Sequence, residues 1–199
     1  MTHNLGTVQR RLTSIIEDFK RARETWQEIN SHAFPHANTL TNTVIQSKYV
    51  DEAQYWHPAL TLEFPNLIQK FDSKIQVLIE KQNRNLCDLV EKMGKQYNKM
   101  ESQLSEICAL NDGSSVKVPI FKTCFLSNYI ERMKEIVKMY SLELNTKRSL
   151  VSKGIRNILT REEGVVLLSI WINQPSLIKS SLDEWDDICM TEMGFDVAS

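Results

Sequence analysis

The longest pattern in the chain is a helical one. From Asn66 to Leu110 there is no proline and one glycine, Gly94, and apolar residues recur mostly at steps of three and four, the spacing of one helix face. The stripe consists of Leu67, Ile68, Phe71, Ile75, Leu78, Leu86, Leu89, Met93, Tyr97, Met100, Leu104 and Ile107. At about 1.5 Å per residue such a helix would be roughly 68 Å long. We expect a long helix over 66–110 that packs against other helices, which favours a scaffold or adaptor over an enzyme.

Residues 7–50 predict two N-terminal helices. The first carries a coiled-coil-like seam with steps of three and four, formed by Leu12, Ile15, Phe19, Ala22, Trp26 and Ile29. Pro35 disfavours a helical conformation at the residue before it, so we expect an interruption over 31–35 and then a second, shorter helix. Residues 51–65 contain two prolines and predict a connector.

The clearest turn lies within residues 111–122, where asparagine, aspartate, glycine and serine cluster. We expect it to reverse the chain, so that a return helix over 123–154 runs antiparallel to the long helix. The apolar stripe of the return helix comprises Phe125, Leu126, Tyr129, Met133, Ile136, Val137, Tyr140, Leu144, Leu150 and Val151. Gly154 is a candidate C-terminal stop for this helix.

Residues 160–194 predict two short C-terminal helices. Each begins with a capping-box pattern, Thr160 with Glu163 and Ser181 with Glu184. No stretch of the sequence predicts a pair of strands. The predicted fold is therefore all-α: an elongated helical bundle with a long antiparallel coiled-coil-like hairpin and short C-terminal helices, forming a single unit over residues 1–199.

Composition narrows the class of protein. The net charge is −1, so we expect no general attraction to nucleic acid. The longest apolar run, residues 164–172, is too short to span a membrane, and the polar first residues do not resemble a signal peptide. We expect an intracellular, soluble protein whose four widely spaced cysteines are small core residues.

Charge is distributed unevenly. Residues 119–161 hold nine Lys or Arg against three acids, a balance of +6, whereas residues 180–199 hold six acids and no Lys or Arg, a balance of −6. Two interpretations stay open. Either the acidic segment folds back on the basic helix, or the two segments form separate surfaces for partners.

No motif indicates catalysis or a cofactor. Phosphate-binding glycine loops, nucleophile elbows and paired-cysteine metal sites are all missing. His32 and His36 lie four residues apart, but Pro35 between them should spoil a helical metal-binding face. Asp186 and Asp187 are adjacent, so on a helix they diverge and favour a solvated face over an acid–base pair. We expect no enzyme activity, no cofactor and no metal.

The segment from Leu167 to Pro175 is the candidate partner-binding site. Trp171, Gln174 and Pro175 lie close together at a helix end, with the basic Lys147 and Arg148 as a second part of the contact region. Tryptophan is favoured at interface hot spots. In the alternative interpretation Trp171 fills the core, and Gln174 with Pro175 simply terminates the helix.

Several segments, in matching order and spacing, resemble a known family. They are Trp26–Asn30 with Phe34 and Ala37–Asn38, Glu106–Cys108, Pro119–Phe121 with Thr123, Met139–Leu144 with Lys147–Arg148, Leu168–Pro175, and Glu192–Gly194. In these segments the chain resembles the cyclin-dependent-kinase-interacting protein family, CINP. Most of the resemblance lies in the last hundred residues, and the segment 50–66 has no match.

The resemblance implies a small, non-catalytic helical adaptor in the nucleus and cytoplasm. The family is associated with replication and checkpoint kinases, and with a complex of AAA+ ATPases that acts in large-ribosomal-subunit maturation and chromatin-linked protein turnover. The expected partners are therefore AAA+ ATPase subunits and cyclin-dependent and other checkpoint kinases. An alternative from the residues alone is a homodimeric coiled-coil tether or cytoskeletal linker that pairs through the seam over 12–29.

Overall fold

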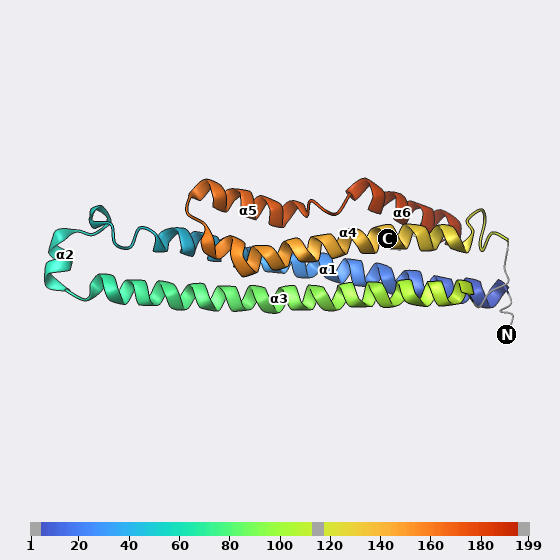
Figure 1. The fold of residues 1–199 in the computed structure, drawn as a ribbon, viewed down its shortest axis with the longest axis horizontal. Helices are drawn as coiled ribbons and strands as arrows, with labels where there is room; N and C mark the ends of the chain where they lie inside the picture. Colours follow the sequence, from blue (N-terminus) through green and yellow to red (C-terminus); the bar gives the residue numbers. More distant parts are fainter. Residues whose placement is uncertain (1–4, 113–117, 195–199) are drawn as a thin grey trace. The chain divides into compact units, whose positions relative to one another are not determined.

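The computed structural model describes residues 5–112 and 118–194, and all regular structure within them is helical (Figure 1). The α-helices are α1 (Leu5–Ser47), α2 (Pro58–Glu63), α3 (Leu67–Asp112), α4 (Leu126–Ser149), α5 (Arg161–Asn173) and α6 (Lys179–Met193). Shorter helical turns are η1 (Ala53–Tyr55), the π-helical η2 (Leu150–Gly154) and η3 (Ile155–Asn157). The prediction of an all-α helical bundle is confirmed.

Helix α3 confirms the long helix that the apolar spacing predicted. Its buried side chains include Ile75, Ile79, Leu86, Leu89, Val90, Met93, Met100, Ile107 and Leu110. The N-terminal part of α3 differs from the prediction, because Phe71 is 44% exposed and Leu78 is exposed as well. Phe71 packs edge-to-face against Trp56, with ring centroids 5.3 Å apart. The apolar stripe of α3 is thus only partly covered near its N-terminus.

Helix α1 shows that the interruption expected over 31–35 was wrong. The helix passes through Pro35 without a break. Proline removes one backbone hydrogen bond and crowds the carbonyl four residues earlier, here that of Ser31. Both residues lie on the exposed side of α1, so water can bind the freed carbonyl, while the buried Ala33 and Ala37 continue the core-facing stripe. The burial of Ala33 and Ala37 therefore outweighs the tendency of Pro35 to interrupt a helix.

Contacts divide the chain into two compact units, where the sequence pattern predicted one unit over residues 1–199. Among the described residues, unit 1 comprises 5–27, 94–112, 118–144 and 175–194, and unit 2 comprises 28–93 and 145–174. Helices α1, α3 and α4 contribute to both units, so the boundary falls within helices. Unit 1 adds α6 to these segments, and unit 2 adds α5.

Unit 1 has an aromatic core. Trp26 of α1 lies edge-to-face against Tyr140 of α4, and Trp185 of α6 has the same geometry against both Phe19 and Tyr129. The portions of α3 and α4 in this unit run in opposite directions, as the predicted hairpin requires (Figure 1). Part of the predicted turn, residues 113–117, lies outside the described residues. The return helix begins at Leu126, three residues later than expected.

Unit 2 depends on a close approach between α5 and α1. A Cβ atom on Gly164 would lie 2.8 Å from Thr41 Cγ2 and 3.1 Å from Ile45 Cδ1. Glycine at this position therefore lets α5 pack directly on α1. The predicted connector over 51–65 is not fully irregular, because it contains η1 and the short helix α2.

The two predicted capping boxes have different outcomes. At the start of α5, the Thr160 side chain accepts a hydrogen bond from the Glu163 N–H, which confirms the cap. At α6 the prediction was wrong, because the helix begins at Lys179, and Ser181 lies inside it. A serine followed three residues later by glutamate also occurs within helices, so this pattern alone cannot fix the first residue.

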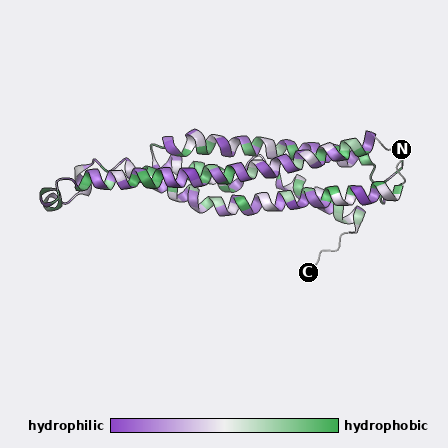
Figure 2. Cartoon of the chain, turned by 90° about the horizontal axis from the view of Figure 1, so that it is seen from below, coloured by the Kyte–Doolittle hydropathy of each residue, from purple (hydrophilic) through white to green (hydrophobic). Residues whose placement is uncertain are grey.

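Hydrophobic and hydrophilic residues are mixed along the helices, as expected for helices that bury one face (Figure 2). Across residues 5–112 and 118–194, no helix combines the length and apolar character needed to cross a membrane.

Candidate partner-binding surfaces

The predicted contact residues Trp171 and Lys147 pack together inside unit 2. Both are 0% exposed. The Lys147 ammonium lies 4.5 Å from the centroid of the Trp171 ring and donates a hydrogen bond to the Trp171 carbonyl oxygen. An ammonium over an aromatic face is attracted by the ring quadrupole, more strongly when desolvated. Trp171 therefore anchors α5 in the core, as the alternative interpretation of this segment required.

The other three predicted contact residues lie at the ends of α4 and α5. Gln174 is buried and adopts a left-handed conformation, with φ 45° and ψ 65°, while its N–H bonds the Ile170 carbonyl. Pro175 follows and cannot continue the helix. Pro175 and Arg148 are exposed, so of the five predicted residues these two are accessible to a partner. Partner binding by this group stays a prediction.

After a charged first turn (Arg161–Glu163), the exposed side of α5 carries apolar side chains. Val165 and Val166 are each 57% exposed and Ile172 is 52% exposed, with the exposed Leu159 just before the helix. Val165, Ser169 and Ile172 follow a 4–3 spacing, so they share one face of the helix. Larger exposed apolar patches on proteins mark interaction sites. We call Leu159, Val165, Val166, Ser169 and Ile172 the α5 outer face.

The sequence analysis predicted only part of the α5 outer face. The candidate segment Leu167–Pro175 does contain Ser169 and Ile172, but the predicted contact residues were Trp171, Gln174 and Pro175, and Leu159, Val165 and Val166 lay outside the segment. A usable signal was present, however, because the run over 164–172 is apolar around the whole helix. A helix with apolar residues on every side needs cover on every side. Among the described residues, Gly164 and Trp171 of α5 are buried, whereas Val165, Val166 and Ile172 are more than half exposed.

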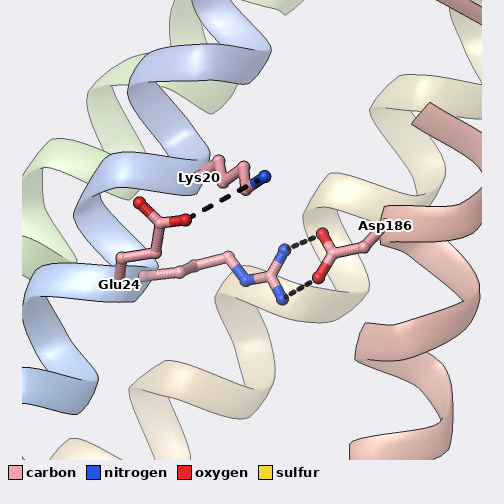
Figure 3. A network of polar contacts seen from close by, with 4 residues as sticks. Lys20, Glu24 and Asp186 are labelled. Atoms are coloured by element: carbon pink, nitrogen blue, oxygen red, sulfur yellow. Dashed lines mark hydrogen bonds and ion pairs between the residues drawn. The ribbon is translucent and has the colours of Figure 1, made fainter. Parts of the chain in front are cut away.

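Helix α6 is held in unit 1 by charge as well as by packing. The Arg23 guanidinium binds the Asp186 carboxylate through two hydrogen bonds of 2.6 and 3.0 Å (Figure 3). The Arg23 side chain is only 10% exposed. Glu184 forms a second ion pair, 2.9 Å from Arg132 of α4. The acidic C-terminal segment thus does fold back on the basic segment through Glu184, whereas Asp186 pairs with α1.

Glu192 fixes the C-terminal end of α6 to the segment before α4. Its carboxylate accepts hydrogen bonds from the backbone N–H groups of Lys122 at 2.9 Å, Thr123 at 3.0 Å and Cys124 at 3.3 Å, and from the Thr123 hydroxyl. Burial raises the pKa of this carboxyl group, but the hydrogen bonds outweigh burial and lower the pKa to about 2. Glu192 therefore stays ionised at neutral pH and acts as a latch for α6.

The cysteines and histidines of the described residues do not form a reactive or metal-binding cluster. No group of three or more His, Cys, Asp or Glu side chains lies close enough to hold a metal in residues 5–112 and 118–194. Burial raises the pKa of the Cys189 thiol to about 12, so it remains a protonated, weak nucleophile. His32 and His36 do share a face of the unbroken α1, contrary to expectation, and His36 Nδ1 lies 2.8 Å from Gln82 Oε1.

Comparison with known proteins gives consistent matches. No protein-family model matches the chain. Cyclin-dependent kinase 2-interacting protein from Bos taurus is 25% identical over 183 residues, which cover 87% of this chain and 84% of the relative. The proteins of the same name from Homo sapiens and Xenopus laevis are each 24% identical, over 86% of this chain and 82% of the relatives. These relatives are named as interacting proteins, not as enzymes. Three matches that extend over most of both chains support the assignment of this all-α protein to the family of cyclin-dependent kinase 2-interacting proteins.

Proposed function

We propose that this protein is a non-catalytic helical adaptor that binds a cyclin-dependent kinase and further protein partners. The relatives' printed name supports a kinase as one partner. The α5 outer face is the observation that carries the binding part of the proposal, because its valines and isoleucine are more than half exposed in the part of the chain that the structure describes. Leucine, valine and isoleucine at helical spacing are the anchors that a helix-in-groove interface uses.

The family resemblance supports a more specific role for the adaptor. We propose that it is a subunit of an AAA+ ATPase complex that acts in large-ribosomal-subunit maturation, and that it is linked to replication and checkpoint kinases in the nucleus and cytoplasm. The proposed contact residues are Lys147, Arg148, Trp171, Gln174 and Pro175. Of these, Arg148 and Pro175 are exposed, and we propose that a partner contacts these two.

A homodimeric coiled-coil tether is the weaker proposal. It needs the seam over 12–29 to be available to a second copy. Leu12, Phe19 and Trp26 are instead fully buried within the single chain. Opening that seam for a second copy would expose the core of unit 1 to water.

Direct binding to cyclin-dependent kinase 2 tests the kinase part. The purified full chain, the double variant Val165→Glu/Ile172→Glu and the control Val118→Glu would each be titrated onto the immobilised kinase. Glutamate keeps the helix propensity of α5 while it disrupts an apolar contact. Val118 is a similarly exposed valine outside the helices, so it controls for the introduction of a glutamate at an exposed apolar position.

We expect the double variant to bind at least about tenfold more weakly, equivalent to about 1.4 kcal/mol, with an unchanged melting temperature. The Val118→Glu control should bind like the unmodified chain. Equal binding of all three proteins would contradict the role of the α5 outer face. If the unmodified chain did not bind the kinase, the kinase part of the proposal would be wrong.

The assembly part is tested by affinity purification of the tagged full chain from cells, followed by mass spectrometry. AAA+ ATPase subunits should co-purify in constant ratio through a second column. If kinases are recovered without any AAA+ subunit, the proposed place in an ATPase complex is wrong while the adaptor function stands.

A further inference from the structure

The connector between α1 and α3 exposes aromatic and aliphatic side chains. None of the residues of α2 is buried, and Leu62 is 87% exposed. Tyr55, Leu60 and Phe64 are exposed as well. Much of the apolar surface of these side chains stays in contact with water, although apolar residues of this size contribute strongly when they are fully covered.

The connector is nevertheless ordered against the start of α3. The Trp56 indole N–H donates a hydrogen bond of 2.6 Å to the Val50 carbonyl, and the Trp56 ring packs edge-to-face on Phe71. Tyr49 and Tyr55 also contact each other, with ring centroids 5.6 Å apart. The exposed apolar surface is therefore held in place before any partner arrives, which reduces the entropic cost of binding.

Two parallel rows of side chains follow the outward side of α3. The apolar row is Leu67, Phe71 and Leu78, and the basic row is Lys70, Lys74 and Lys81. Both rows have the spacing i, i+4, i+11, so they lie side by side along one surface of the helix. We call these six residues the α3 lysine ridge. A shallow groove of about 480 Å³ lies at its start, lined by residues of both rows.

The α3 lysine ridge has an unbalanced positive charge. Within the described part of the chain, no carboxylate forms an ion pair with Lys70, Lys74 or Lys81. The two acids in the same stretch of α3 do not pair with these lysines. Asp72 is half-buried, and Glu80 pairs with Arg156. An occupant of this surface must therefore supply apolar side chains and, beside them, negative charge.

We infer that the α3 lysine ridge, together with the exposed connector, binds an amphipathic helix of a protein partner that carries acidic side chains along one edge of its apolar face. A second copy of this chain fits poorly, because pairing ridge against ridge would bring lysines together. The inference rests on the proposed adaptor function only in that both involve protein partners. It concerns a surface separate from the α5 outer face.

The probe is a fluorescein-labelled synthetic helix of about three heptads, with leucine at positions a and d and glutamate at e and g. A matched peptide carries lysine in place of every glutamate. Fluorescence anisotropy with the full chain measures the affinity for each peptide. The variants are Phe71→Ala and the triple charge reversal Lys70→Glu/Lys74→Glu/Lys81→Glu, each checked for helix content and melting temperature by circular dichroism.

The glutamate peptide should bind the unmodified chain at least about tenfold more tightly than the lysine peptide, and the preference should weaken as salt is raised. The triple charge reversal should invert the preference, which loss of folding cannot do. Phe71→Ala should weaken binding about tenfold or more. The α5 variant Val165→Glu/Ile172→Glu should bind the glutamate peptide normally, so that failure of this inference is distinguishable from failure of the proposed function.

Equal affinity for the two peptides, or an unchanged preference in the charge-reversed variant, would overturn the inference. Lysine-dependent co-sedimentation with phosphatidylserine vesicles, without peptide binding, would show a lipid surface as the occupant. A dimer in light scattering that Phe71→Ala dissociates would show a second copy. Either of these results would replace the partner helix that we infer.

Discussion

Helices α5 and α6 are anchored in the same way but differ in the side chains that they expose. Each is a short helix fixed by one buried tryptophan, Trp171 in unit 2 and Trp185 in unit 1. Exposed acids of α6 pair with Arg23 and Arg132 of neighbouring helices, whereas α5 exposes valine and isoleucine. The difference indicates that α6 completes the fold of its unit, while α5 leaves apolar surface for another protein to cover.

The largest expected effect comes from removing either tryptophan. Trp171→Ala and Trp185→Ala should each lower the free energy of unfolding by about 3–5 kcal/mol, because each leaves a cavity in a packed core. Denaturant unfolding followed by circular dichroism measures the change, with the exposed Ile172→Ala as a control that should cost little. If Trp171→Ala kept its stability but lost partner binding, Trp171 would be a direct contact, and the comparison of the two helices would fail.

The Glu192 latch should make the stability of unit 1 depend on pH. The folded pKa of about 2 lies below the ordinary value of 4.5, so the stabilisation is present above about pH 4.5 and is lost as the pH falls through about 2. Glu192→Gln should therefore cost about 1–2 kcal/mol at neutral pH, and this cost should shrink as the pH falls towards 2. Urea unfolding at several pH values measures this difference. A constant difference between the two proteins at all pH values would contradict a role for the ionised carboxylate.

A methyl group at Gly164 should loosen α5 but not α6. Gly164→Ala places Cβ against Thr41 and Ile45, so we expect a net loss of about 1 kcal/mol even though alanine favours the helix. Gly6→Ala is the matched control, because no atom lies within 4 Å of its new Cβ, and it should be neutral or slightly stabilising. Thermal unfolding of both variants tests this. Equal melting temperatures would mean that α5 does not pack closely on α1.

The smallest effects should come from the ion pairs around α6. Asp186→Asn leaves the nearly buried Arg23 without its carboxylate partner and should cost about 1 kcal/mol. Glu24→Gln removes the exposed pair with Lys20, whose atoms lie 4.0 Å apart, and should change stability by less than about 0.5 kcal/mol (Figure 3). Parallel urea titrations at low salt can resolve the two. The reverse order of effects would show that burial of Arg23 does not matter.

The sequence predicted the features that depend on regular spacing. The long stripe of α3 and the seam of α1 were found because a buried helix face repeats every three or four residues. The break at Pro35 was predicted wrongly, because local preference cannot include the burial of Ala33 and Ala37 on a shared core. Similarly, the pattern of Ser181 and Glu184 could not show that α6 begins two residues before Ser181, at Lys179.

The candidate surfaces were harder to predict than the fold. The attachment of Glu192 to residues about 70 positions earlier in the chain leaves no local pattern. The same holds for the burial of Lys147 against Trp171, which no local pattern around either residue indicates. For α5, composition showed that the helix is apolar, but only the packing of Gly164 on α1 shows which side remains uncovered.

Amide hydrogen exchange of the full chain, alone and bound to cyclin-dependent kinase 2, tests the central claim most directly. If α5 is the partner-binding helix and α6 completes the fold, binding should slow exchange over residues 159–173 and leave residues 179–193 unchanged. Slower exchange over 179–193, with 159–173 unaffected, would contradict the account.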